Sequence, residues 1–202
     1  RAAHELGYKA VIAEGADHLL GHRSPNFVYH PPGQQISVLL KNYRLSDDIA
    51  FRFGNRGWAE WPLSTEKFAG WVNQVNGCGY TVNLFMDYET FGEHQWTDTG
   101  IFEFLYHLPG AVMSLPENDF KMPSEVVAAY PPIGEFDAPH LISWADTERD
   151  LSAWLGNAMQ SNALQELFNL EQAVKANKDP ELLHDWRRLT TSDHFYYMCT
   201  KW

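Results

Sequence analysis

Short apolar runs that alternate with helical patterns constrain the fold of this chain more than any other feature. One run lies at about residues 8–13, a second at Ile36–Leu40 and a third at Thr81–Met86. Before the third run, apolar residues recur at helical spacing between Ser64, a candidate N-cap, and Gly77, a candidate C-cap glycine. Near-continuous apolar strands separated by helices are typical of a parallel sheet that is covered on both faces. The sequence therefore predicts an α/β fold.

Polar and ionisable side chains follow each of the three runs. Glu14 follows the first run, Lys41 and Asn42 follow the second, and Asp87 follows the third. In α/β folds, the functional groups gather at the carboxyl ends of the strands. We therefore expect these side chains to lie together at one edge of the sheet.

The sequence changes in character after residue 108. Proline and glycine become frequent, which predicts mostly loop with one helix at Ser124–Ala129. Two clear helical patterns follow: residues 164–174 place apolar residues along one face, and a second helix begins with Asp179 as N-cap and Pro180 in the first turn. The side chains of the second helix expected to face inward are Leu182, Leu183, Trp186 and Leu189.

Charge and cysteine content narrow the classes of partner. The net charge of −11 argues against nucleic acid, because phosphate binding needs a basic surface. No apolar run approaches the ~18 residues that cross a bilayer, so no membrane partner is expected. Cys78 and Cys199 show no metal-ligand spacing and indicate no disulfide framework. The default prediction is a reducing, cytoplasmic location, and the sequence does not predict an oligomeric state.

Ionisable residues are densest in the stretch LFMDYETFGEHQW, residues 84–96. In one interpretation, Asp87 is a general acid/base for glycoside cleavage, which needs two carboxylates beside the scissile bond. In a second, Asp87, Glu89 and His94 ligate a divalent metal, as in a metal-dependent carbohydrate deacetylase. In a third, the carboxylates, Glu93 included, are solvated loop charges. An Asp-x-Glu pair followed five residues later by His matches no tight ligand signature, so no metal is predicted.

The same stretch closely resembles the fourth conserved region of glycoside hydrolase family 57, the α-amylase and glucanotransferase family. The shared pattern is an Asp, a Glu two residues later, and then Phe-Gly. LGYKAVIAEGADHLLGHRSPNFVY is similar to the strand and loop after the nucleophile region in the amylase branch, and ISWADTERDLSAWLGNAMQ is similar to that branch's fifth conserved region. The resemblance covers essentially the whole chain, and three ordered motifs are far more specific than one.

The resemblance implies a retaining mechanism on α-linked glucans. One carboxylate attacks the anomeric carbon, while the other protonates the leaving oxygen and then activates water. It places Asp87 as the general acid/base. The family's nucleophilic Glu closes an earlier strand, so it is expected upstream of Arg1, and Glu14 does not occupy its place. Residues 1–202 alone are therefore expected to be inactive.

Four further residues are predicted to contact the substrate. His94 lies seven residues after Asp87, where some relatives place an aromatic that borders the sugar; its alternative role is to stabilise the loop. Trp144 and Asp146 belong to the fifth-region match, and Trp144 either stacks on a glucose ring or packs in the interior. Glu14 either lines the cleft or caps the turn that follows it. No cofactor is implied.

The resemblance also implies an architecture. Residues 1–108 are expected to be the C-terminal part of a (β/α)7 barrel, and residues 109–202 a loop-rich and then helical region, all within a longer chain. The parent is predicted to be an α-amylase-like hydrolase whose partner is an α-glucan oligo- or polysaccharide. The alternatives are a non-catalytic glucan-binding relative that lacks the nucleophile, and a metal-dependent carbohydrate deacetylase.

Overall fold

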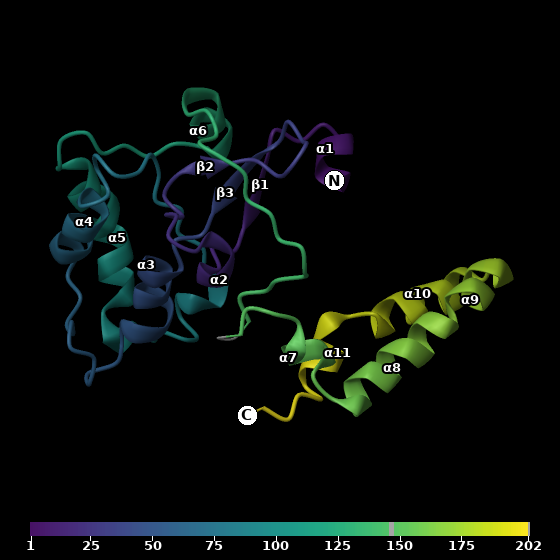
Figure 1. The fold of residues 1–202 in the computed structure, drawn as a ribbon. Helices are drawn as coiled ribbons and strands as arrows, with labels where there is room; N and C mark the ends of the chain where they lie inside the picture. Colours follow the sequence, from purple (N-terminus) through teal and green to yellow (C-terminus); the bar gives the residue numbers. More distant parts are fainter. Residues whose placement is uncertain (146–147, 202) are drawn as a thin grey trace. The chain divides into compact units, whose positions relative to one another are not determined.

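The computed structural model describes residues 1–145 and 148–201, which form two compact units, Arg1–Asp137 and Ala138–Trp202. The first unit combines a small sheet with helices, and the second unit is helical (Figure 1). The mixed α/β content predicted from the sequence is confirmed. The strands in the described residues form an open sheet and not a closed barrel.

The sheet has three strands: β1 (Ala10–Ala13), β2 (Val28–Tyr29) and β3 (Ser37–Leu40), in the order β1-β3-β2. β1 runs parallel to β3, with Ala13 opposite Leu40. This parallel pair agrees with the first two predicted strands. β2 is antiparallel to β3, so the expectation of a purely parallel sheet is wrong.

The third predicted strand, Thr81–Met86, is also wrong. Within it, Asn83 makes one isolated parallel bridge, to Lys41. β2 already pairs with the edge of β3 that faces away from β1, so this segment meets β3 only at its carboxyl end. The N–H groups of Tyr80 and Thr81 donate instead to the carbonyl of Asn26, at 2.7 and 3.1 Å.

Short and medium helices make up much of the rest of the first unit. They are α1 (Ala2–Glu5), α2 (Asp17–Leu20), α3 (Tyr43–Asp47), the π-helical segment η1 (Asp48–Arg52), α4 (Thr65–Asn73), the 3₁₀ turns η2 (Tyr88–Thr90) and η3 (Thr97–Thr99), α5 (Ile101–Met113) and α6 (Pro123–Ala129). The predicted cap of α4 is confirmed, because Ser64 Oγ accepts the N–H of Lys67 at 3.2 Å. The helix predicted at Ser124–Ala129 corresponds to α6.

Helix α5 passes through residue 108, where the sequence predicts that loop begins. Its buried face consists of Ile101, Phe104, Leu108 and Val112. Pro109 lies inside the helix and removes one backbone donor, at a cost of about 3 kcal/mol. Burial of each large apolar side chain contributes about 1.5–3 kcal/mol, so the packed face outweighs the proline. A division between a barrel and a helical region near residue 108 stays a prediction.

The second unit consists of α7 (Ser152–Leu155), α8 (Ala158–Asn169), α9 (Glu171–Asn177), α10 (Pro180–Leu189) and α11 (Ser192–Tyr196). Its core contains Leu167, Val174, Trp186 and Phe195. The pattern over residues 164–174 therefore belongs to two helices, which meet at Leu170.

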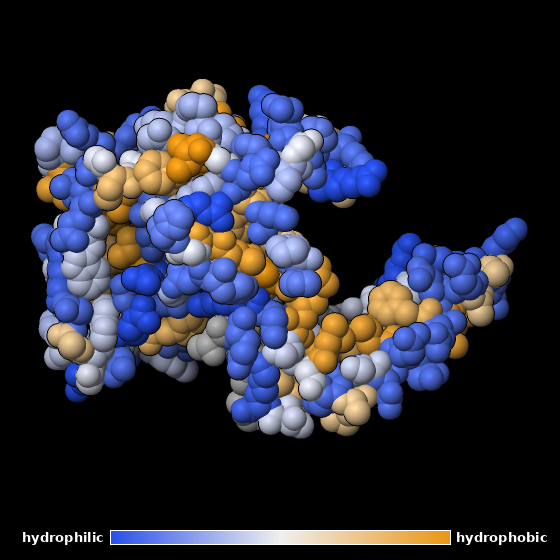
Figure 2. Space-filling view, in the orientation of Figure 1, coloured by the Kyte–Doolittle hydropathy of each residue, from blue (hydrophilic) through white to orange (hydrophobic). Residues whose placement is uncertain are grey.

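Helix α10 begins as predicted, because Asp179 Oδ1 accepts the N–H of Glu181 at 2.9 Å. The buried apolar face of α10 is narrower than predicted. Trp186 is buried and Leu183 packs beside it, but Leu182 and Leu189 are exposed. Apolar side chains therefore reach the surface of this unit (Figure 2). In the described part of the chain, no helix has both the length and the apolar character that crossing a membrane requires.

Candidate active site

The carboxyl ends of β1 and β3 meet in a buried group of charges. Lys41 Nζ lies 3.9 Å from Glu14 Oε2 and 3.7 Å from Asp47 Oδ1, and the three side chains are 5%, 5% and 14% exposed. The expectation that Glu14 and Lys41 lie together is confirmed. Asp47, at the end of α3, was not predicted.

The close approach of the ends of β1 and β3 explains why residue 15 is a glycine. A Cβ atom on Gly15 would lie 2.3 Å from the backbone carbonyl oxygen of Lys41, which is far inside van der Waals contact. Only glycine lets the chain leave β1 this close to the end of β3. Glycine at this position is thus required by the geometry of the site.

Asn42 connects the end of β3 to its surroundings. Its N–H donates to the carbonyl of Asn83 at 2.9 Å, and its side-chain oxygen caps α3 by accepting the N–H of Leu45 at 3.1 Å. Asn83 Nδ2 donates in return to the carbonyl of Leu40, also at 2.9 Å. The segment that leads to Asp87 is therefore attached to the strand end, although it is not itself a strand.

Asp87 follows that segment and has an exposed side chain. The expectation of a carboxyl group at the end of a buried strand is wrong, because the residue ends no strand and is not buried. The carbonyl of Asp87 accepts the N–H of Thr90 at 3.0 Å, which begins the turn η2. The carboxyl group is thus presented to solvent at the start of a tight turn.

The remaining ionisable residues of the motif belong to this turn. The carbonyl of Glu89 accepts the N–H groups of Glu93, at 3.1 Å, and His94, at 3.0 Å. The side chains of all three residues are exposed. Gln95 ends the turn, since its N–H donates to the carbonyl of Thr90 at 2.9 Å.

A second, exposed charge group lies at the starts of α2 and α3. Asp17 Oδ2 accepts from the Tyr43 hydroxyl at 2.6 Å and lies 3.4 Å from Arg44 Nη2. The hydrogen bond to Tyr43, and then the carboxylate of Asp17, raise the pKa of Arg44 above its usual value. The nearby Arg23 donates to the carbonyls of Leu19 and Leu20, at the end of α2.

The other predicted contacts lie outside the first unit. Trp144 is part of the second unit and is partly exposed, and its carbonyl accepts from Arg149 Nη1 at 2.9 Å. Asp146 lies outside the described residues. Of the predicted site residues, the structure places Glu14, Asp87 and His94 in one compact unit.

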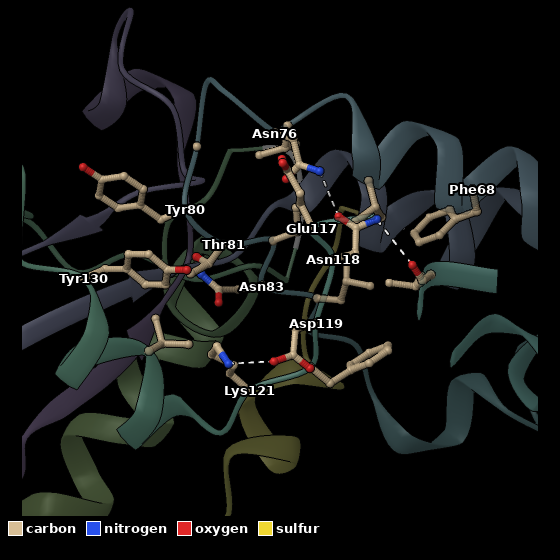
Figure 3. A pocket seen from close by; sticks show the side chains of 18 of the residues that line it. Phe68, Asn76, Tyr80, Thr81, Asn83, Glu117, Asn118, Asp119, Lys121 and Tyr130 are labelled. Carbon is tan, nitrogen blue, oxygen red and sulfur yellow. Dashed lines mark hydrogen bonds and ion pairs between the residues drawn. The ribbon is translucent and has the colours of Figure 1, made fainter. Parts of the chain in front are cut away.

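A cavity of about 230 Å³ lies between α4, α5, α6 and the segment 79–84 (Figure 3). Its lining is apolar at Phe68 and Leu108, on the inner sides of α4 and α5. At its rim, Asn76 Nδ2 donates to Asn118 Oδ1 at 3.0 Å. Asp87 is not among the residues that line this cavity, so the cavity is not the predicted catalytic site.

The described residues contain no group of three His, Cys, Asp or Glu side chains placed to hold a metal ion. The interpretation of Asp87, Glu89 and His94 as metal ligands therefore gains no support from their geometry.

Comparison with known proteins identifies relatives by sequence. Residues 1–139 match the model of glycosyl hydrolase family 57. A protein of Methanocaldococcus jannaschii named "Putative alpha-amylase" is 44% identical over 211 aligned residues, which include all of this chain and 44% of that protein. The chain thus spans less than half the length of this relative. No solved structure matches the chain.

Proposed function

Because the chain belongs to glycosyl hydrolase family 57, we propose that the whole protein is a retaining glycoside hydrolase that cleaves α-linked glucans. The observation that carries this proposal is the Asp-x-Glu-x-Phe-Gly turn at Asp87–Gly92. It lies within the matched region and presents its first carboxylate to solvent, four residues after Asn83, which bridges to Lys41 at the carboxyl end of β3.

In the proposed mechanism, Asp87 is the general acid/base. A Glu from outside residues 1–202 attacks the anomeric carbon, while Asp87 gives its proton to the glycosidic oxygen, whose bond to that carbon breaks. Asp87, now ionised, then takes a proton from water as the water displaces the Glu. An exposed carboxyl group supports this role, because the acid must come within about 2.6–3.2 Å of the leaving oxygen.

The architecture proposed for the whole protein is a (β/α)7 barrel to which β1 and β3 contribute neighbouring strands. The parallel pairing of β1 and β3, with charged residues at their carboxyl ends, supports it. His94 and Trp144 have accessible side chains and are proposed to contact the sugar. Glu14 is buried, so its proposed contribution is at the floor of the site, beside Lys41. Asp146 stays a prediction.

The test is substitution of Asp87 in the full-length protein. We expect Asp87→Asn to lower kcat on a soluble α-glucan by about 10²–10⁴-fold, because the variant has no proton to give to the leaving oxygen. The matched control is Asp98→Asn, which removes another exposed carboxylate eleven residues later, in η3. The first sugar released by the unsubstituted protein should have the α configuration. A β product would exclude the retaining mechanism.

Two other outcomes would decide between the alternatives. Retardation of the full-length protein by amylose in a native gel, without hydrolysis, would identify a non-catalytic glucan-binding protein. Starch hydrolysis by purified residues 1–202 would show that the nucleophile lies within them, contrary to its proposed place.

A further inference from the structure

Two buried polar side chains form hydrogen bonds that attach the chain to α3–η1 before and after Asp87 in the sequence. Ser46, on α3, is fully buried, and Gln95, at the end of the Asp87 turn, is 5% exposed. Burying a hydroxyl or an amide is unfavourable unless each finds hydrogen-bond partners. The partners of both side chains are backbone groups, and both contacts join α3–η1 to the segment that carries Asp87.

The first contact lies before Asp87. Ser46 Oγ donates to the carbonyl of Asn42 at 2.8 Å and accepts the N–H of Phe85 at 3.1 Å. Phe85 is two residues before Asp87, in the segment that makes no regular ladder with β3. The serine hydroxyl therefore satisfies a backbone donor that a neighbouring strand would otherwise satisfy.

The second contact lies after Asp87. Gln95 Nε2 donates to the carbonyl of Ala50 at 2.9 Å. Ala50 belongs to η1. π-helical turns are rare overall, and those that occur are often found at functional sites. The neighbouring Gly54 leaves room for this contact, because a Cβ atom there would lie 2.6 Å from Gln95 Oε1.

We propose that Ser46 and Gln95 are positioning residues that hold the Asp87 turn at two points of α3–η1. This proposal rests on the proposed role of Asp87 as the general acid/base. Attachment on both sides fixes the backbone from which the carboxyl group projects. A displacement of about 1 Å in a catalytic group can cost about 10²-fold in rate, so two side chains that never touch the sugar would control proton transfer.

The experiment compares two substrates in the full-length protein. A glucan has a poor alcohol leaving group that needs the proton of Asp87, whereas 2,4-dinitrophenyl α-maltoside releases a phenolate that does not. For Ser46→Ala and for Gln95→Met, we expect kcat on the glucan to fall about 10–100-fold, with KM unchanged within about twofold. For the aryl maltoside, kcat/KM should fall less than about threefold, because kcat/KM reports the first displacement and not the later step in which Asp87 takes a proton from water. Ser46→Cys is slightly larger than serine and is only a weak hydrogen-bond donor and acceptor; it replaces Ser46→Ala if that variant does not fold.

The matched control is Thr90→Val. Thr90 lies between the two contacts and its hydroxyl is buried, but the described residues offer that hydroxyl no hydrogen-bond partner. We expect this variant to keep kcat on the glucan and kcat/KM on the aryl maltoside.

Three results would overturn the proposal: kcat on the glucan kept within about twofold in both variants, a fall in kcat/KM on the aryl maltoside as large as that in kcat on the glucan, or the same fall in Thr90→Val. Failure of the proposed function looks different. In that case, Asp87→Asn keeps full activity or the unsubstituted protein cleaves no glucan, and the positioning role falls with it.

Discussion

Lys41→Met tests whether the buried charges at the ends of β1 and β3 hold the fold together. Methionine keeps the apolar stem of the side chain and removes the ammonium group. Glu14 Oε2 and Asp47 Oδ1 lie 3.9 and 3.7 Å from Lys41 Nζ, so the variant leaves two largely buried carboxylates without this cation. Removing one partner from a buried ion pair costs about 3–5 kcal/mol. For a chain of this size, that loss lowers Tm by roughly 6–20 °C.

The assay is urea and thermal unfolding followed by circular dichroism. Arg44→Met is the matched control, because Arg44 and Asp17 form an ion pair whose side chains are 75% and 58% exposed. The control should lose no more than about 1 kcal/mol. Adding Glu14→Gln to Lys41→Met should recover at least about 0.5 kcal/mol, since it removes one of the two buried carboxylates that face the lost ammonium group. A loss in Lys41→Met no larger than that in Arg44→Met would refute the reasoning.

The same unfolding assay tests two further features. Gly15→Ala should lose about 1–3 kcal/mol or more, because its Cβ would meet the carbonyl of Lys41 at 2.3 Å. Gly70→Ala should gain about 0.5–1 kcal/mol, because Gly70 lies inside α4 and its Cβ would meet nothing within 4 Å; a loss there would contradict the described helix. Burial raises the pKa of Tyr29 above its ordinary value of 10.0, and the charge of Arg23 offsets part of this rise. Well below pH 10, the folded and the unfolded protein both keep the hydroxyl proton of Tyr29. At higher pH the unfolded protein loses this proton first. The free energy of unfolding therefore falls as the pH rises through the pKa of Tyr29 in the folded protein. The free energy of unfolding of Tyr29→Phe should fall less steeply between about pH 9 and pH 11 than that of the unsubstituted protein. Equal slopes in the two proteins would show that Tyr29 does not contribute to the pH dependence.

Features with a local cause were predictable from the sequence. The caps of α4 and α10 were found because Ser64 and Asp179 bond to N–H groups two or three residues ahead. The parallel pair of β1 and β3 followed from two apolar runs and the connection between them.

Features that depend on distant residues were not predictable. The apolar run at residues 81–86 looks like a strand, but β2 already occupies the edge of β3 where it would pair. Pro109 looks like the end of a helix, but the packed face of α5 carries the helix past it. In both cases tertiary contacts overrode the local signal.

The residues of the candidate site also fall into a predictable and an unpredictable group. The sequence motif identified Asp87 because the residues that define the motif are close neighbours in the sequence. Ser46 and Gln95 contact backbone groups 39 and 45 residues away, and no periodicity distinguishes a buried hydroxyl or amide from an exposed one. Asp47 was missed for the same reason, since only the fold brings it to Lys41.

A turn that binds glucan and a turn that transfers a proton make different demands on the backbone. Stacking and hydrogen bonding to a sugar tolerate small shifts, which waters and side chains absorb. Proton transfer requires donor and acceptor atoms about 2.6–3.2 Å apart. The Asp87 turn is attached to α3–η1 on both sides of an exposed carboxyl group, by side chains whose burial is favourable only while those hydrogen bonds exist. This rigidity serves the catalytic role better than the binding role, which is why loss of either contact is expected to change kcat and leave the affinity for glucan intact.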